Sequence, residues 1–476
     1  MVAKGYGQKE GIDYHETFAP VVKYKSLRVI LALANEMDYE IKQLDVVTAF
    51  LNAYIKEDVY MQQPQGFEQG GDNNNLVCKL NKTLYGIKQA PHEWNNEIND
   101  FLVHTLCFKR CITDTCLYVK QSKRGRVMII ALFVDDIIPT FHTQDGAEWN
   151  SYKVQLMSKF KIQDKSDCEW ILGMKVTRDR KRKVLALDQG LYIEKVLTRF
   201  NMMNCNPAPT PETAGVKLSI KDCPETIEEK KSMENIPYKA AVGSLLYASI
   251  ATRPDIAHAV NEVSKYMQNP GPTHWQAIKR IFRYLRGTIK KPLIFKGNWY
   301  KPNSSRATVP EYSIEAYSDA DWAGDVDSRR STTGYVVQIN NSTVSWLSKK
   351  QATVALSSAE AEYMAIATVA QEIKWLSQLM EELSSIANFI SKKNITVYSD
   401  NQAAIAISKN DVHHDRTKHI DIRHHFIRDC VKEGVFNIQW ISTKEQIADT
   451  LTKGLDKLQF TTLIRKVMGP ESSSLS

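Results

Sequence analysis

The sequence predicts a protein of mixed helices and strands, built from about three domains. The chain has 476 residues and 43% of them are hydrophobic, which is enough to give each domain a packed core. Apolar residues at helical steps alternate with short β-branched runs, and two polar stretches, NPAPTPETAG at 206–215 and the loop 297–311, interrupt this alternation. These observations predict domains at 1–205, 206–300 and 312–460, followed by a tail at 461–476.

The first 205 residues are expected to contain both kinds of element. The apolar spacing predicts helices over 26–37, 92–106, 147–160 and 189–202. Short β-branched runs predict a strand at 41–46 and a pair of strands within 168–188. The most apolar stretch, VMIIALFVDDIIPTF at 127–141, is short, rich in β-branched and aromatic residues and free of helix caps. It predicts a buried hairpin with two aspartates at its turn.

Asp135 and Asp136 are unusual in such an apolar setting. A buried charge without a partner costs several kcal/mol, so such a pair is usually neutralised by cations or protons. An isolated Asp-Asp pair is also common in ordinary polar turns, and this alternative stays open from the local sequence alone.

The second and third regions differ in composition. Residues 237–288 are expected to be mostly helical, and their last helix, HWQAIKRIFRYLRGT, has a basic face that faces either solvent or a polyanion. The third region predicts strands at EAYSDADW, ITVYSD and FNIQWIS, and a hairpin from GYVVQI to VSWLS. It also predicts a long amphipathic helix from SSAEAEYMA, a helix at NQAAIAISK, another near 417–433, and a last one at EQIADTLTKGL.

Two groups of acids stand near the ends of these elements. Asp45 ends the strand 41–46 and lies in the same region as Asp135 and Asp136, whereas the other group belongs to the third region and comprises Asp319, Glu362, Asp400 and Asp449. Carboxylates about 4 Å apart repel by about 4 kcal/mol at an effective dielectric constant of 20. Converging acids therefore favour Mg²⁺ or Mn²⁺, and pairs of such ions catalyse displacement at phosphorus. The alternative is seven ordinary acids among the 54 in the chain.

Composition and motifs argue against several other classes of protein. The net charge of +8 permits a polyanionic partner, and no apolar run is long enough for a membrane span. The chain contains neither Walker nor Rossmann glycine motifs, and no CxxC pair. His104, Cys107, Cys111 and Cys116 lie close in sequence but fit no common zinc spacing, so reduced core cysteines are the preferred interpretation. Without a signal peptide, the protein is expected to be intracellular.

Ten sequence blocks follow one another in the order found in a known family. They include QLDVVTAFLNAYIKEDVYMQQPQGF, LYGIKQAPHEW, ALFVDDI, WILGMKV, HWQAIKRIFRYLRGT, YSDADWAGD, SSAEAEYMA, YSDNQAAI and QIADTLTKGL. Over more than 400 residues, the chain resembles the reverse transcriptase and ribonuclease H portion of a copia-type LTR retrotransposon Pol polyprotein. This resemblance implies an α+β right-hand polymerase with fingers, palm and thumb, followed by a ribonuclease H-like α/β domain with a mixed five-stranded sheet. It also implies fingers that are incomplete at the N-terminus.

The resemblance assigns polymerase roles within the first 300 residues. Asp45, Asp135 and Asp136 would be the palm carboxylates, with the Val46 carbonyl as a further metal ligand. Phe50 would exclude the ribose 2′-hydroxyl, although a core aromatic is the ordinary interpretation, and Gln89 would lie near the incoming nucleotide. Contacts to the primer and the duplex would come from Leu172, Gly173, Lys279, Arg280, Arg283 and Arg286.

The resemblance to ribonuclease H makes Asp319, Glu362, Asp400 and Asp449 a metal-binding tetrad that cleaves the RNA strand of an RNA–DNA hybrid. The nearby residues His413, His414, His419, His424 and His425 leave open a zinc site or a basic helix facing the hybrid. Two divalent ions per active site are implied.

The implied partners are an RNA template, a DNA primer, the RNA–DNA hybrid and dNTPs, in a cytoplasmic particle or the nucleus, with a homodimer also possible. Three functions fit: an enzyme with both activities, a truncated or co-opted copy with ribonuclease H alone, and a catalytically silent nucleic-acid-binding protein.

Overall fold

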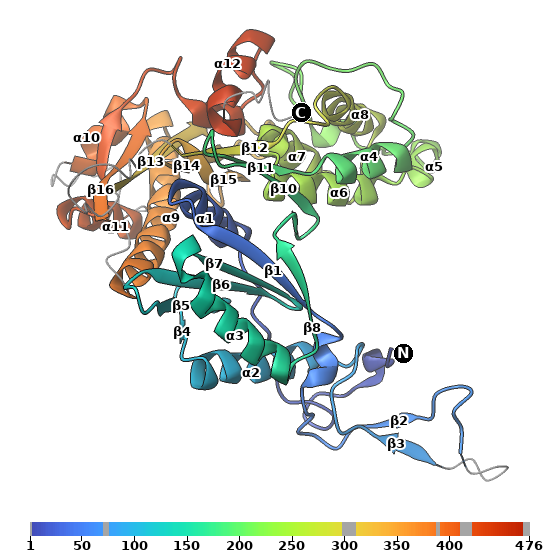
Figure 1. Cartoon of the computed structure of the whole chain (residues 1–476). Helices are drawn as coiled ribbons and strands as arrows, with labels where there is room; N and C mark the ends of the chain where they lie inside the picture. Colours follow the sequence, from blue (N-terminus) through green and yellow to red (C-terminus); the bar gives the residue numbers. More distant parts are fainter. Residues whose placement is uncertain (1, 70–75, 298–310, 387–390, 410–420, 470–476) are drawn as a thin grey trace. The chain divides into compact units, whose positions relative to one another are not determined.

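The computed structural model describes residues 2–69, 76–297, 311–386, 391–409 and 421–469. These residues form two compact units, each assembled from separate parts of the chain (Figure 1). We call them unit 1, which comprises residues 1–27, 39–168 and 381–389, and unit 2, which comprises residues 28–38, 169–380 and 390–476. Two helices, α1 (Tyr24–Glu36) and α9 (Ser358–Ile386), contribute residues to both units.

Unit 1 contains a six-stranded sheet in the order β4-β5-β6-β7-β1-β8, in which every neighbouring pair is antiparallel. The strands are β1 (Glu40–Val46), β4 (Lys109–Arg110), β5 (Leu117–Gln121), β6 (Val127–Phe133), β7 (Asp136–Phe141) and β8 (Ile162–Asp167). The core of this sheet also takes in α2 (Ala90–Asp100) and α3 (Gly146–Lys159), through side chains such as Trp94 and Trp149.

Short elements complete unit 1. They are the single-turn helices η1 (Gly5–Gly7), η2 (Ala49–Asn52) and η4 (Thr143–Asp145), the π-helical turn η3 (Phe101–Thr105), and the ribbon of β2 (Tyr60–Gln62) and β3 (Val77–Lys79). The predicted helix 92–106 is therefore α-helical only to Asp100, and its last turn widens into η3. The predicted hairpin, and the helices 26–37 and 147–160, are observed within about two residues of their expected limits.

Unit 2 begins with a four-stranded antiparallel sheet in the order β12-β11-β10-β9. Its strands are β9 (Trp170–Ile171), β10 (Met174–Asp179), β11 (Val184–Asp188) and β12 (Leu293–Lys296). The sequence predicted two strands here. The fourth strand, β12, begins about 105 residues after the end of β11, so no local sequence pattern predicts that the two strands pair. This pairing also explains why the predicted boundaries at 205 and 300 do not separate compact units.

The helices of unit 2 follow this sheet in the chain. They are α4 (Gly190–Arg199), α5 (Ile227–Glu234), α6 (Tyr238–Ala251), α7 (Ala257–Ser264) and α8 (Pro272–Gly287), with the short turns η5 (Ile220–Asp222) and η6 (Pro254–Ile256). A fully buried ion pair fixes their packing, because Arg253 donates two hydrogen bonds of 2.9 and 2.8 Å to the Asp255 carboxylate. Tyr284 of α8 donates a third to the same carboxylate.

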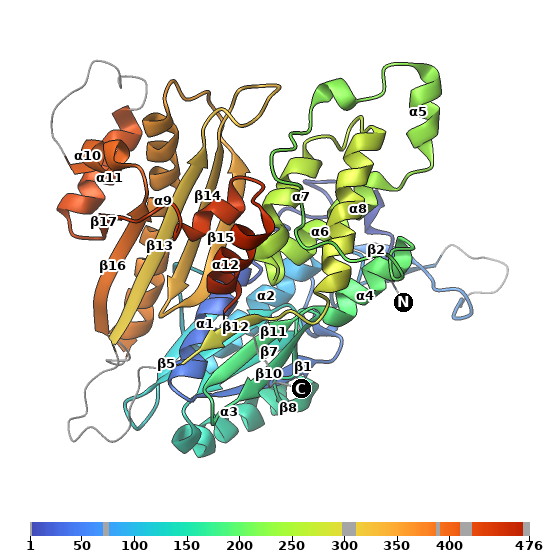
Figure 2. The same ribbon diagram turned by 90° about the horizontal axis from the view of Figure 1, so that it is seen from above.

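A second, five-stranded sheet of unit 2 has the order β15-β14-β13-β16-β17 (Figure 2). The strands β13 (Glu311–Asp321), β14 (Thr332–Ile339) and β15 (Ser342–Lys350) are antiparallel, while β16 (Ser391–Ser399) and β17 (Asn437–Trp440) run parallel to β13. Helix α9 packs on β13 through small side chains such as Ala361 and Ala365. The other helices are α10 (Gln402–Lys409) and α11 (Asp421–Lys432).

The end of the chain differs from the prediction. The segment EQIADTLTKGL contains only a 3₁₀ helix, η8 (Ile447–Leu451), and the expected tail contains most of a helix, α12 (Lys457–Met468). The side chain of Asp456 caps α12, and Phe460, Leu463 and Ile464 bury its inner face. The expected tail is therefore wrong for residues 461–468. No helix in the described ranges combines the length and apolar character that a membrane span requires.

Candidate active sites

The first acid group lies at one end of the sheet in unit 1. Asp45 of β1 stands opposite Asp136 of β7, and the pairing of Phe133 with Asp136 leaves only Val134 and Asp135 in the turn. Strand register alone therefore brings Asp45, Asp135 and Asp136 together, and we call these three residues the hairpin acids. The predicted hairpin is observed, but only Asp135 lies in its turn, because Asp136 is the first residue of β7.

The turn that carries Asp135 is held by its backbone. Val134 has a φ of +50°, which is costly for a β-branched residue. The surroundings enforce it, because the indole N–H of Trp94 donates to the Val134 carbonyl at 2.6 Å. The amide of Val46 donates to the Asp135 carbonyl at 2.8 Å. These two hydrogen bonds fix the main chain at Asp135, whose side chain is half-buried.

The hairpin acids are half-open to solvent and partly neutralised. The side chain of Asp45 is 36% exposed and its Oδ2 lies 3.4 Å from the Lys165 ammonium. Gln43 donates a 2.7 Å hydrogen bond to Asp136 Oδ1. Burial, and then the charges of Asp135 and Asp45, raise the pKa of Asp136. Solvent and the Lys165 ammonium therefore compensate much of the negative charge of the hairpin acids.

Two aromatic rings lie beside the hairpin acids. Phe50 in η2 is half-buried, and its ring centroid is 4.7 Å from that of Tyr85. Burial, followed by the charge of Asp135, raises the pKa of the Tyr85 hydroxyl, which places this residue near the acids. Sequence reasoning did not single out Tyr85, although it lies in the conspicuous block LYGIKQAPHEW.

Gln89 has a structural role in unit 1. Its side chain is fully buried, accepts a 3.0 Å hydrogen bond from Gln8 and donates one of 2.8 Å to the Asp13 carbonyl. A third bond, of 3.3 Å, goes to Glu57. The amide therefore ties the N-terminal segment to the start of α2, and the nearness of Gln89 to an incoming nucleotide stays a prediction.

The predicted primer and duplex contacts lie in unit 2. Leu172 and Gly173 form a two-residue turn between β9 and β10 with φ values of +50° and +75°, and Tyr247 donates to the Leu172 carbonyl at 2.6 Å. On α8, Lys279 lies over the Trp275 ring at 5.9 Å.

The arginines of α8 hold the preceding linker. Arg286 donates to the Met203 carbonyl at 2.6 Å, Arg283 to the Asn206 carbonyl at 2.8 Å, and Arg280 to the Thr210 hydroxyl at 2.9 Å. We call residues 203–210 the braced linker. These half-buried guanidinium groups therefore also stabilise the fold, and their contact with a nucleic-acid duplex stays a prediction.

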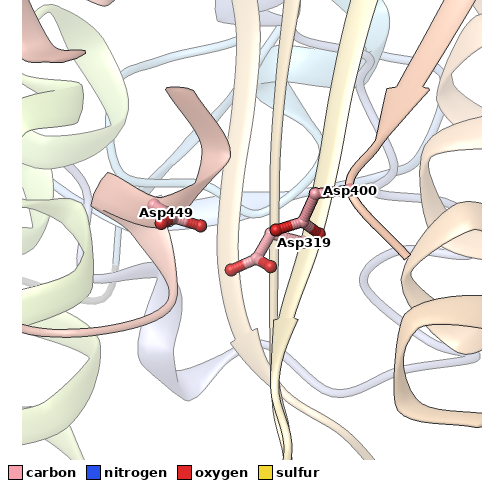
Figure 3. A group of neighbouring side chains, drawn as sticks. All are labelled: Asp319, Asp400 and Asp449. Atoms are coloured by element: carbon pink, nitrogen blue, oxygen red, sulfur yellow. The ribbon is translucent and has the colours of Figure 1, made fainter. Parts of the chain in front are cut away.

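The second acid group is much tighter. Asp319 lies near the end of β13 and Asp400 directly follows β16, and the parallel register of these strands sets them side by side (Figure 3). Asp449 reaches the same place from η8, and one oxygen from each of these three residues lies within 4.8 Å of the others. Among the described residues, this is the one acid, cysteine or histidine group with that spacing.

Glu362 of α9 completes this group, which we call the sheet-edge acids. It is 6% exposed, and the negative charges of Asp319 and Asp400 act on it. Hydroxyl groups bind two of the other acids: Thr452 donates to Asp319, and Thr443 donates to Asp400 at 2.7 Å. The Lys453 ammonium lies 3.0 Å from Asp449 Oδ2. Sequence reasoning identified none of these three partners.

Burial and mutual repulsion dominate the electrostatics of the sheet-edge acids. Burial raises the pKa of Glu362, and the charges of Asp319 and Asp400 raise it further. The pKa of Asp449 is raised by burial and then by Asp319, with Lys453 opposing the shift. Among the described residues, Glu362 Oε2 and Asp449 Oδ1 are buried without a hydrogen-bond partner. Such orphaned hard oxygens at this spacing suit a divalent cation such as Mg²⁺ or Mn²⁺.

The alternative zinc sites gain no support. His413, His414 and His419 lie outside the described residues, as do the side chains of His424 and His425. Cys111 and Cys116 are buried, and burial raises the pKa of both thiols to about 12. Cys107 is exposed, so the expectation of core cysteines is confirmed for Cys111 and Cys116 only.

Comparison with known proteins gives a consistent result. The family described as reverse transcriptase (RNA-dependent DNA polymerase) matches residues 1–214. The retrovirus-related Pol polyprotein from transposon TNT 1-94 of Nicotiana tabacum is 44% identical over 99% of this chain and 34% of its own length. That from transposon RE1 of Arabidopsis thaliana is 40% identical over 98% of this chain and 30% of its own. The chain thus spans about a third of these relatives.

Similarity to solved structures is weaker. The structure of a foamy viral protease-reverse transcriptase in complex with double-stranded DNA covers 89% of this chain and 62% of its own, at 10% identity and a TM-score of 0.42. A TM-score this low does not establish a shared arrangement.

Proposed function

Because the chain belongs to the copia-type retrotransposon Pol polyproteins with a reverse transcriptase, we propose that it is an RNA-directed DNA polymerase that also cleaves RNA–DNA hybrids. In this proposal, unit 1 supplies the palm and unit 2 supplies the thumb and a ribonuclease H-like domain. The observation that carries it is the presence of two separate carboxylate groups, each assembled at the ends of paired strands.

Both groups are suited to divalent cations. Asp45 and Asp135, with the Val46 carbonyl, would hold two Mg²⁺ or Mn²⁺ ions in unit 1, and Asp136 would stand beside them. The sheet-edge acids would hold two in unit 2. When bound, such ions stabilise the charge that develops on the attacking and leaving oxygens during displacement at phosphorus.

The chain's own side chains would position the substrates. Phe50, backed by Tyr85, would form a wall that leaves no room for a ribose 2′-hydroxyl and so selects dNTPs. Lys165 carries a positive charge beside Asp45, where a triphosphate would bind. The turn at Leu172 and Gly173, together with Lys279, would contact the primer and duplex. In unit 2, recognition of the hybrid by its shape and 2′-hydroxyls would suit cleavage without sequence preference.

A second candidate function is hybrid cleavage without DNA synthesis. It is favoured by one difference between the sites: only the sheet-edge acids, among the described residues, include three carboxylates with oxygens within 4.8 Å. A catalytically silent nucleic-acid-binding protein is the third candidate, and the retention of all seven acids argues against it.

The test is primer extension on an RNA template with Mg²⁺, together with cleavage of a labelled RNA–DNA hybrid by the same preparation. The proposal expects both activities, and both should disappear with EDTA. Cleavage without extension would support the second candidate. Hybrid binding without either reaction, in a protein that unfolds cooperatively, would support the third.

A further inference from the structure

The segment that carries Asp449 also delivers a lysine to the sheet-edge acids. Lys453 follows Asp449 by four residues, and its ammonium nitrogen lies 3.0 Å from Asp449 Oδ2. The Asp449 side chain is fully buried, while the Lys453 side chain is 36% exposed. Thr452, between them, donates to Asp319. One short stretch, DTLTK, thus supplies an acid, a hydroxyl and a cation to the same place.

Lys453 places a positive charge directly against a buried carboxylate. A lysine ammonium is charged at neutral pH, and this one lies 3.0 Å from Asp449 Oδ2. Within the described part of the chain, no other lysine or arginine lies within 4.0 Å of the four acids. Lys453 is therefore their one close counter-charge, in an arrangement whose other contacts are hydroxyls and repelling carboxylates.

We propose that Lys453 is a built-in counter-ion that holds the sheet-edge acids together without metal and competes with one divalent cation for Asp449. This inference rests on the proposed hybrid-cleaving function of the same site. Both carboxylate oxygens of Asp449 are buried without a hydrogen-bond partner among the described residues, and Oδ2 is the one that lies 3.0 Å from the ammonium. A divalent cation that binds Asp449 meets the positive charge of Lys453, and the half-exposed side chain has a route to withdraw into solvent.

If Lys453 competes with a divalent cation, removing its charge should change the metal-free stability and the cation affinity in opposite directions. Removing the positive charge should destabilise the metal-free fold, because the buried acids lose their nearest compensation. It should also tighten divalent cation binding, because the cation no longer displaces the ammonium. A lysine that merely supported the fold would weaken both, since a distorted site binds metal less well.

The experiment uses the full chain with Asp45→Asn and Asp135→Asn, so that Mn²⁺ binding reports on unit 2. Mn²⁺ is titrated calorimetrically, and thermal unfolding is followed in EDTA. Lys453→Met should bind Mn²⁺ roughly 3- to 10-fold more tightly and unfold at a lower temperature without metal. Lys453→Arg should restore both values toward the starting chain. Lys457→Met, which removes an exposed lysine one turn later, is the matched control and should change neither.

One result would overturn the inference alone, and another would overturn the metal site on which it rests. Unchanged or weaker Mn²⁺ binding by Lys453→Met, with lower metal-free stability, would make the lysine purely structural. If Lys453→Met does not fold without metal, Lys453→Gln keeps a polar group and is read in the same way. A folded starting chain that binds no Mn²⁺ would instead refute the proposed metal site itself, and the two failures are thus distinguishable.

Discussion

The two acid groups solve the same electrostatic problem in different ways. The hairpin acids come from adjacent antiparallel strands, stay partly exposed and are compensated by Lys165 and Gln43. The sheet-edge acids come from four elements spread over 131 positions of the chain, and Asp319 and Asp449 are almost completely buried. Burial raises the pKa of Asp136 in the first group and those of Glu362 and Asp449 in the second, and the shifts in the second group are the larger ones.

This difference shows what each site requires from its surroundings. Water screens the hairpin acids, so their geometry depends mainly on the rigid turn at Val134. The sheet-edge acids lack that screening, so protons, Lys453 or divalent cations must balance them. Cations should therefore be a condition for catalysis in unit 1 and, in addition, a condition for full stability in unit 2.

The largest expected effect is the independent loss of each activity. Asp135→Asn should reduce DNA synthesis by about 10³-fold or more and leave hybrid cleavage intact, because each ion supplies several kcal/mol to the transition state. Asp400→Asn should do the reverse. Both activities are measured on one preparation of each variant, with thermal unfolding as the control. If either substitution removed both activities from a folded protein, the two sites would not be separate.

The next effect is on stability without metal. The pKa of Glu362 and of Asp449 is higher in the folded than in the unfolded chain, so the folded state holds more protons between the two values. Their contribution to stability is therefore fully present below about pH 4 and is lost as the pH rises through their folded pKa values. Unfolding in EDTA should show lower midpoints at about pH 8 than at about pH 6, and Mg²⁺ should reverse this. Unfolding midpoints that do not change with pH would mean that the sheet-edge acids do not repel one another.

The variant Glu362→Gln tests the charge of the sheet-edge acids more directly. The amide cannot ionise, so the variant avoids the cost of keeping a proton on Glu362 and should be more stable than the parent in EDTA. The gain should grow by up to about 1.4 kcal/mol per pH unit above about pH 5. Denaturant midpoints of the two proteins at several pH values measure it. A constant difference at all pH values would place the effect in packing instead of charge.

The smallest expected effect concerns the hairpin acids. Gln43→Ala removes the 2.7 Å hydrogen bond to Asp136 Oδ1, which is worth about 1.5–3 kcal/mol for a charged acceptor and less when solvent can replace it. DNA synthesis should fall by roughly tenfold, while hybrid cleavage and stability stay nearly unchanged. Steady-state primer extension measures the loss. An equal loss of hybrid cleavage would show that the substitution in unit 1 also affects the site in unit 2, contrary to this prediction.

Local sequence patterns predicted the neighbouring placement of Asp135 and Asp136, because a hairpin's register follows from the turn and the strands beside it. Asp45 joins them only through the pairing of β1 with β7, whose partners lie about 90 positions apart, so its approach was no more accessible to local patterns than that of the sheet-edge acids. Their order in the chain was visible through a family resemblance, but their convergence depends on parallel pairing between β13 and β16, whose paired residues lie about 80 positions apart. Periodicity within either strand contains no information about such a partner.

Other features were missed for related reasons. The basic face of α8 was correctly located, but the braced linker that its arginines bind has no periodic pattern. The family resemblance placed Gln89 near the incoming nucleotide, and the hydrogen bonds of its buried amide to distant parts of unit 1 were not predicted. Lys453 carried one usable signal, its four-residue spacing from Asp449. That spacing is common on helices and drew no attention.

The braced linker also has a consequence for protein engineering. A free segment of this length would behave as a flexible tether, with ends roughly 15 Å apart on average. Here three arginine side chains fasten it at Met203, Asn206 and Thr210, so its path is set by α8 and its own composition matters little. A protease site inserted between these anchors would allow the chain to be cut while side-chain bonds keep both pieces associated. The braced linker is therefore a rational place to divide the polypeptide into two separately expressed halves.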